Sequence, residues 1–212
     1  MKADKSSPLM LHDSEQFSDC TIVCGPCQFK AHKFLLSTHS EYFSKAFQID
    51  TFKEGERGQL ELKATQPDSE DSVDACDDPE IVEWMIHYFY HLDYLNSQSQ
   101  EDPTRAPETE VHLVEHAKTF AMAIKYQVQG LRNLAASKFE ASVAKDWKHD
   151  DFSHATYIVY TSTPDDVTDL RKIVATAIHD NIRLFRKKPE IQSLLRSIPG
   201  LAYDLLELEL AL

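Results

Sequence analysis

Residues 17–47 constrain the fold more than any other stretch, because three periodic patterns follow one another there without a gap. Residues 19–24 alternate polar and apolar, which is the period of a half-buried strand. Gly25 and Pro26 can then form a two-residue loop, since glycine supplies the positive φ of the first position of a type II′ turn and proline suits the second. Residues 28–31 resume the alternation, so this stretch predicts a β-hairpin.

A pair of short helices is expected directly after the hairpin. From His32 the apolar spacing lengthens to that of a helix, which breaks near Thr38–His39. Its apolar residues are Phe34, Leu35 and Leu36. Ser40 is a good N-cap for a second helix. That second helix is predicted to bury Tyr42, Phe43, Ala46 and Phe47.

These residues, in this order, resemble the opening of the BTB/POZ domain family, whose pattern reads roughly Asp, apolar strand, turn, Phe-x-Ala-His-Lys/Arg, Leu and Ser-x-x-Phe. The matching words are Ser18-Asp19, Phe29-Lys30-Ala31-His32-Lys33 and Ser40-Glu41-Tyr42-Phe43. Further on, the residues from Ala123 to Leu131 resemble the family's Ala-x-Lys-Tyr-x-x-x-x-Leu, which joins its last two core helices. The resemblance implies an α+β fold in which a small sheet is covered by a cluster of helices. Short fungal proteins of this family are most similar to this layout.

The rest of the chain predicts one more strand and a series of helices. Residues 59–62 alternate like a strand, and Asp78-Pro79-Glu80 is a helix start whose helix runs to about residue 91. Its buried stripe is Val82, Met85, Ile86 and Phe89. Later helices are expected at about 111–128, across Leu131–Phe139, around 152–159, at about 165–187, from Pro189, and over 201–212.

We therefore divide the chain into a lead, a BTB/POZ domain and an all-α extension. The lead covers residues 1–14, the domain 15–146 and the helical extension 147–212. Two loops interrupt the domain: an acidic one at 64–78, which has no basic residue, and a polar one at 96–110. The acidic loop is too polar to offset its ordering entropy, so we expect it to be flexible.

Charge and apolar content exclude several functional classes. The net charge of −13 over 212 residues repels phosphates, which disfavours nucleic-acid binding. The densest basic run, Arg183 to Lys188, is interpreted as the cationic end of a helix. No apolar run approaches the length of a membrane span, and the N-terminus has no signal core. We expect a cytoplasmic or nuclear protein with reduced cysteines and without cofactor or metal.

The sequence Cys24-Gly25-Pro26-Cys27 matches the active-site motif of thioredoxin. That chemistry requires the first cysteine at a helix N-terminus, where the helix dipole lowers the pKa of its thiol. Here a strand pattern follows, and the paired positions flanking a two-residue hairpin suit a disulfide poorly. A zinc site would need a second pair of ligands. A redox enzyme remains a remote alternative.

His112-Leu113-Val114-Glu115-His116 spells H-x-x-E-H, the signature of one group of zinc peptidases. The helical wheel places the buried face on Leu113, Ala117, Phe120 and Ile124. His112, Glu115 and His116 then lie roughly opposite and should face solvent as an ordinary polar surface. A zinc peptidase also remains only a remote alternative.

Two groups of site residues are implied by the resemblance. In family members that bind corepressor peptides, charges matching Asp19 and Lys33 line a groove at the dimer seam, together with residues matching His32 and Leu35. The alternative is an ion pair that only orients strand and helix, with His32 as a structural histidine. Phe52-Lys53-Glu54 matches the motif through which many members contact cullin-3, and Tyr90 and Tyr94 would complete that surface.

The sequence thus predicts a non-catalytic protein–protein interaction module. The favoured hypothesis is a homodimerising adaptor that recruits cullin-3 in a ubiquitin ligase. A dimeric scaffold or corepressor-type module without a ligase role is the alternative. The expected seam uses the lead and the two helices of residues 31–47, on a different face from Phe52 and Glu54.

Overall fold

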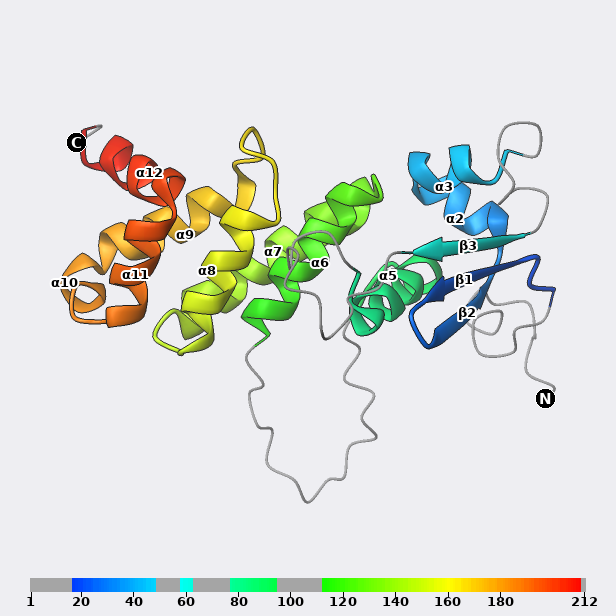
Figure 1. Cartoon of the computed structure of the whole chain (residues 1–212), viewed down its shortest axis with the longest axis horizontal. Coiled ribbons are helices and arrows are strands. Elements are labelled where there is room, and N and C mark those ends of the chain that lie inside the picture. Colours follow the sequence, from blue (N-terminus) through cyan, green and yellow to red (C-terminus); the bar gives the residue numbers. More distant parts are fainter. Residues whose placement is uncertain (1–16, 49–57, 63–76, 95–111, 211–212) are drawn as a thin grey trace, which may run out of the picture. The chain divides into compact units, whose positions relative to one another are not determined.

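The structure is a computed structural model that describes residues 17–48, 58–62, 77–94 and 112–210 (Figure 1). The chain forms two compact units. Unit 1 comprises Met1–Thr104 and Met122–Arg132, and unit 2 comprises Arg105–Ala121 and Asn133–Leu212. Two of the three divisions fall inside helices, α6 (Leu113–Lys125) and α7 (Gln129–Asp146), so each of these helices contributes residues to both units.

Unit 1 contains a three-stranded sheet in the order β2-β1-β3. Strands β1 (Cys20–Cys24) and β2 (Cys27–Ala31) are antiparallel and set Cys24 opposite Cys27. Gly25 takes a φ of 55°, as the predicted turn requires. Strand β3 (Gln59–Leu62) pairs with β1 in parallel. The predicted hairpin and the predicted third strand are confirmed.

The helices of unit 1 begin at the predicted caps. The Ser40 hydroxyl, between α2 (Lys33–His39) and α3 (Glu41–Ala46), accepts a hydrogen bond from the Phe43 backbone N–H at 3.1 Å. The Asp78 carboxylate caps α5 (Pro79–His91) through the Glu80 N–H at 3.1 Å. Together with the sheet, these helices confirm the α+β class.

Aromatic rings form the centre of the unit 1 core. The ring of Phe43 stacks on that of Tyr126 at a centroid distance of 5.6 Å and meets Phe89 edge-on at 5.7 Å. Nearby, a Cβ atom on Gly130 would overlap the Tyr88 hydroxyl, so only glycine lets the start of α7 approach α5 this closely. The stripe of α5 predicted from Val82, Met85, Ile86 and Phe89 is buried, as expected.

The regular elements described in unit 2 are all helices, joined by turns. Besides parts of α6 and α7 it contains α8 (Asp151–Thr161), α9 (Asp169–Asp180), α10 (Ile182–Phe185), α11 (Pro189–Ser197) and α12 (Pro199–Leu210). The Phe152 and Phe185 rings stack at 5.2 Å in its core. Other buried apolar side chains are Leu170, Val174, Ile178, Ile191 and Leu201.

The single helix predicted at about 165–187 was wrong. Residues 164–167 form a turn closed by the Val167 N–H and the Pro164 carbonyl at 3.0 Å, and α9 begins only at Asp169. Asn181 leaves the helical region, with φ −114° and ψ 22°, and its side chain donates to the Ala177 carbonyl at 3.0 Å. Such local side-chain bonds compete with helix continuation, so α9 ends there.

The last helix also differs from its predicted bounds of 201–212. It begins at Pro199, because Ile198 is extended and proline suits the first helical position. Several other predictions lie outside the described residues. These are the lead at 1–14, most of the acidic loop, the loop at 96–110, and the cullin-type residues Phe52 and Glu54.

Candidate functional site

Asp19 connects the sheet to the first helix of unit 1. Its Oδ1 atom accepts a hydrogen bond from the Lys33 backbone N–H at 2.7 Å. His32, the N-cap residue of α2, makes no capping bond with its own side chain, so the carboxylate of Asp19 takes over that role. The Lys33 Nζ atom lies 5.5 Å from the centroid of the Phe47 ring, within cation–π range. This geometry favours the structural interpretation of Asp19 and Lys33 over a peptide-binding groove.

His32 and Leu35 lie at the same end of α2. The His32 Nδ1 atom and the Tyr90 hydroxyl are hydrogen-bonded at 2.7 Å, and the two rings meet edge-on. Burial raises the pKa of Tyr90 to about 12, so its hydroxyl stays protonated. Leu35 is half-buried. His32 therefore ties α2 to the end of α5, as a structural histidine would.

Phe34 is the exposed residue that the sequence analysis missed. Its side chain is 77% exposed on α2, and that of Phe17 is 79% exposed just before β1. The hydrogen bond between Asp19 and Lys33 holds these two neighbourhoods together. A signal was available: successive helical residues are 100° apart, so three consecutive apolar residues, 34–36, cannot all face one core.

Tyr90 and Tyr94, predicted to contact cullin-3, are both buried. Tyr94 is stacked with Trp84 at a centroid distance of 6.0 Å. Neither side chain is accessible to a partner protein. Each can affect partner binding only indirectly, by holding the end of α5 in place. This corrects their predicted role as direct contacts.

Asp77 is the centre of a buried polar network that joins distant segments of unit 1. Its Oδ1 atom lies 2.9 Å from Lys125 Nζ, and its Oδ2 atom accepts a hydrogen bond from the Tyr126 hydroxyl at 2.6 Å. Burial, and then the bond to Asp77, raises the pKa of Tyr126. The Ser40 hydroxyl donates to the Tyr126 carbonyl at 2.6 Å. Asp77 was predicted to lie in a flexible loop, and its burial corrects that prediction.

The Cys-Gly-Pro-Cys motif lies in the hairpin and not at a helix start. The Cys24 thiol is buried beneath the sheet and contacts the Asp77 backbone carbonyl at 3.6 Å. Burial, followed by the nearby Asp77 charge, raises the pKa of Cys24 to about 11. Because the thiolate is the reactive form, these surroundings oppose thioredoxin-type chemistry.

His116, from the H-x-x-E-H motif, is buried in unit 2, whereas the sequence analysis expected it in solvent. The helical wheel was wrong here because burial extends almost all the way round α6, to His116, Thr119 and Met122 as well as the predicted stripe. His112 and Glu115 are half-buried. Across the described ranges, no group of three or more His, Cys, Asp or Glu side chains is placed to hold a metal ion.

Burial of His116 predicts a loss of stability in mild acid. Burial, with the neighbouring charges of His112 and Lys138, lowers the pKa of His116 from 6.5 to about 4. The unfolded chain therefore binds a proton that the folded chain excludes, so stability is intact above pH 6.5 and falls as the pH drops toward 4. The unfolding free energy should fall by about 2 kcal/mol between about pH 7 and about pH 5.

Urea unfolding of the full chain at both pH values, comparing the wild type with His116→Gln, measures this effect. The variant should lose much less stability between the two values than the wild type does. His154 is exposed, so His154→Gln is the matched control and should follow the wild type. Equal pH dependence in the wild type and His116→Gln would contradict the assignment.

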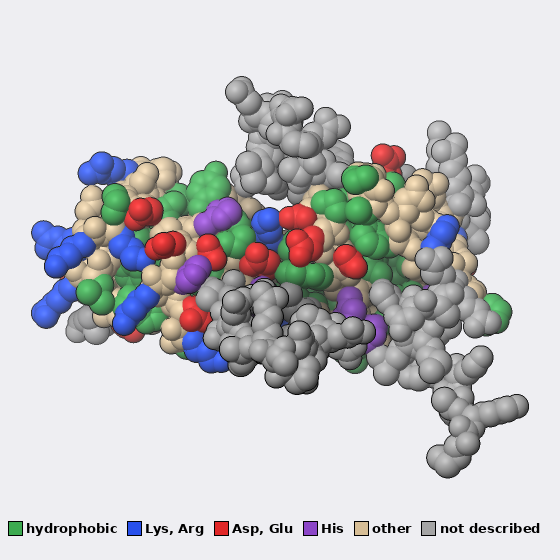
Figure 2. Space-filling view, turned by 90° about the horizontal axis from the view of Figure 1, so that it is seen from below, with side chains coloured by type: hydrophobic (Ala, Val, Ile, Leu, Met, Phe, Trp, Pro, Cys, Tyr) green, Lys and Arg blue, Asp and Glu red, His purple; other side chains and the backbone are tan. Residues whose placement is uncertain are grey.

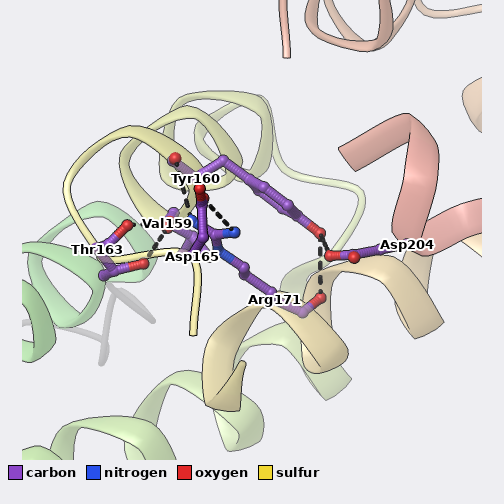
Figure 3. Close-up of polar contacts among 6 residues, drawn as sticks. All are labelled: Val159, Tyr160, Thr163, Asp165, Arg171 and Asp204. Atoms are coloured by element: carbon purple, nitrogen blue, oxygen red, sulfur yellow. Dashed lines mark hydrogen bonds and ion pairs between the residues drawn. The ribbon is translucent and has the colours of Figure 1, made fainter. Parts of the chain in front are cut away.

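A second buried network holds together the helices of unit 2 (Figure 3). Arg171, from α9, donates through Nη2 to the Thr163 carbonyl at 3.0 Å, and its guanidinium lies 5.0 Å from the centroid of the Tyr160 ring. The Tyr160 hydroxyl donates to Asp204 of α12 at 2.7 Å, and burial raises its pKa. The exposed Asp165 carboxylate pairs with Arg171 Nη1 at 3.0 Å. These contacts link α8, α9 and α12, which is the pattern of a structural network.

Comparison with known proteins gives a family. A family model described as BTB/POZ domain matches residues 9–143. A solved structure, the BTB domain of zebrafish PATZ1, is similar with a TM-score of 0.41 and 18% identity, over 66% of this chain and 97% of that one. No curated protein matches the chain. Of the helices that the structure describes, none combines the length and apolar character needed to span a bilayer.

Proposed function

Because the chain belongs to the BTB/POZ domain family, whose domains are protein–protein interaction modules that are generally non-catalytic, we propose that it is a homodimerising adaptor. The exposed Phe34 ring carries this proposal. A large aromatic side chain exposed to water in the first turn of α2 is typical of an interface anchor. BTB domains generally self-associate, so the proposed occupant of this surface is a second copy. We propose a cytoplasmic or nuclear location for the dimer.

The dimer contact predicts a specific effect of Phe34→Asp. A carboxylate at this position would have to be desolvated in the interface, so the dimer should weaken by at least about a hundredfold. Light scattering on the eluate of a sizing column should show a lower average mass for the variant than for the wild type, which is a dimer or larger at the same protein concentration. Tyr157→Asp, at an exposed ring of α8 in unit 2, is the matched control. A monomeric wild type at tens of micromolar would contradict the proposal.

Contact with cullin-3 is the second part of the proposal. It is supported by Phe52-Lys53-Glu54, which lies between α3 and β3, where the family has its docking motif. In a pull-down, the immobilised wild type should retain purified cullin-3 N-terminal domain. The Glu54→Lys and Phe52→Ala variants should not retain it. Retention by Glu83→Lys, an exposed acid on α5, would control for net charge. A wild-type dimer without cullin-3 binding would favour the scaffold or corepressor-type alternative.

A further inference from the structure

Near the C-terminal end of unit 2, basic and acidic residues lie in separate stretches of the sequence. Residues 181–188 contain four basic residues and no acid, whereas residues 197–212 contain three acids and no Lys or Arg. The basic residues are Arg183, Arg186, Lys187 and Lys188, and the acids are Asp204, Glu207 and Glu209. In Figure 2 the blue Lys and Arg side chains gather over the C-terminal helices of unit 2. In a chain of net charge −13, such a local basic surface is unusual.

The basic ridge consists of Ile182, Arg183, Leu184, Arg186 and Lys187, all of them exposed. It arises because α10 is a single helical turn that buries only Phe185. The interpretation of this run as the cationic end of a long helix was therefore wrong. Lys188 already pairs with Asp150 at 3.6 Å. The three cations of the ridge form no ion pair with the carboxylates of the described residues.

The acidic face consists of Tyr203, Leu206, Glu207 and Leu210 on α12. These positions have the spacing i, i+3, i+4 and i+7, which is one side of a helix. The side chains of Tyr203, Leu206 and Leu210 are 60%, 55% and 77% exposed. The opposite side of α12 is held by Leu201 in the core and by Asp204, which bonds to Tyr160. Three large apolar side chains on one helix side are thus left in water beside an acid.

The ridge and the face match each other in two ways. Each has large apolar side chains beside charge. The ridge carries three cations, and the face carries the carboxylate of Glu207, since Asp204 bonds to Tyr160 and Glu209 pairs with His179. Within unit 2 the described ion pairs do not join them. We propose that the basic ridge of one copy docks on the acidic face of a second copy. Arginine and tyrosine are the residue types that most often anchor such contacts, and charge pairing sets their orientation.

A polyanion is a poorer fit than a second copy. The net charge of −13 repels an extended nucleic acid or an anionic membrane, while Ile182 and Leu184 offer apolar surface that phosphates cannot use. The acidic face of another copy supplies both a carboxylate and apolar side chains. This contact is separate from the proposed contact at Phe34, so a chain with both could form assemblies larger than a dimer.

A charge-swap experiment tests the proposal in the full chain carrying Phe34→Asp, so that the contact through unit 1 is removed. Arg186→Glu makes ridge and face both acidic, and Glu207→Arg makes both basic. Each variant alone should self-associate at least about tenfold more weakly than its Phe34→Asp parent. An equimolar mixture of the two should associate again, because each altered surface meets its complement. The readout is light scattering against protein concentration at low and high salt.

Two exposed residues of α7 provide matched controls for net charge. Lys145→Glu and Glu140→Arg should associate as the parent does, and circular dichroism should show all variants folded. If either reversal fails to fold, Arg183→Glu or Leu206→Gln takes its place with the same expected weakening. A Phe34→Asp parent that stays monomeric at low salt, or a mixture that does not recover association, would overturn the proposal. Neither result bears on the contact at Phe34.

Discussion

Replacing Asp77 by alanine is expected to lower the free energy of unfolding by about 2–3 kcal/mol, the loss typical of leaving a buried hydrogen-bonding group without its partner. The carboxylate is almost fully buried and accepts hydrogen bonds from Lys125 Nζ at 2.9 Å and the Tyr126 hydroxyl at 2.6 Å. Its removal leaves the buried Tyr126 hydroxyl without that acceptor, whereas the Lys125 side chain, which is 42% exposed, stays hydrated. The effect should be greatest in unit 1, to which all three residues belong.

Chemical denaturation of the full chain would measure the effect, and the neighbouring residue offers a control. Asp78→Ala removes only the cap of α5, bonded at 3.1 Å to the Glu80 N–H, so its cost should be about 1 kcal/mol. A double-mutant cycle with Tyr126→Phe should show strong coupling to Asp77, because the two side chains share one hydrogen bond. Similar losses for Asp77→Ala and Asp78→Ala would mean that the buried network contributes little.

Replacing Arg171 by methionine should destabilise unit 2 by about 3 kcal/mol. Methionine keeps most of the packing of the side chain but cannot donate to the Thr163 and Tyr160 carbonyls, which Nη2 approaches at 3.0 and 3.5 Å. It also removes the cation over the Tyr160 ring. The turn of residues 162–168 should then lose its attachment to α9.

Hydrogen exchange can locate this loss within the chain. Amides of α8 and α9 should exchange faster in Arg171→Met, while those of β1 and β2 in unit 1 keep their protection. Asp165→Asn is the control, because that carboxylate is fully exposed and its pairing with Arg171 is screened by water. Its effect should be much smaller. Faster exchange throughout both units would instead indicate one cooperative structure.

Local signals were sufficient to predict most elements of unit 1. The hairpin followed from alternation around Gly25-Pro26, and the starts of α3 and α5 followed from Ser40 and Asp78, which do act as caps. Each of these signals depends on residues at most a few positions apart. The break at Asn181 in unit 2 was also marked by a local signal, since an asparagine side chain can bond to the backbone and end a helix. It was not predicted, because the apolar stripe continues past Asn181.

Long-range relations could not be predicted in this way. Asp77 was grouped with its acidic neighbours, because composition cannot show that its partners Lys125 and Tyr126 lie 48 and 49 residues further along the chain. His116 was placed in solvent because a helical wheel assumes one buried side. The exposure of Phe34 could not be predicted either, because three consecutive apolar residues do not show which of them faces solvent.

The chain passes between the two units three times, between residues 104 and 105, 121 and 122, and 132 and 133. A single proteolytic cut at any position therefore releases neither unit intact, because each is assembled from discontinuous stretches. A fragment ending at Asp146 would likewise carry the portions of α6 and α7 that belong to unit 2 without their helical neighbours. Expression of unit 2 alone would require a designed linker in place of residues 122–132, and expression of unit 1 alone would require one in place of residues 105–121.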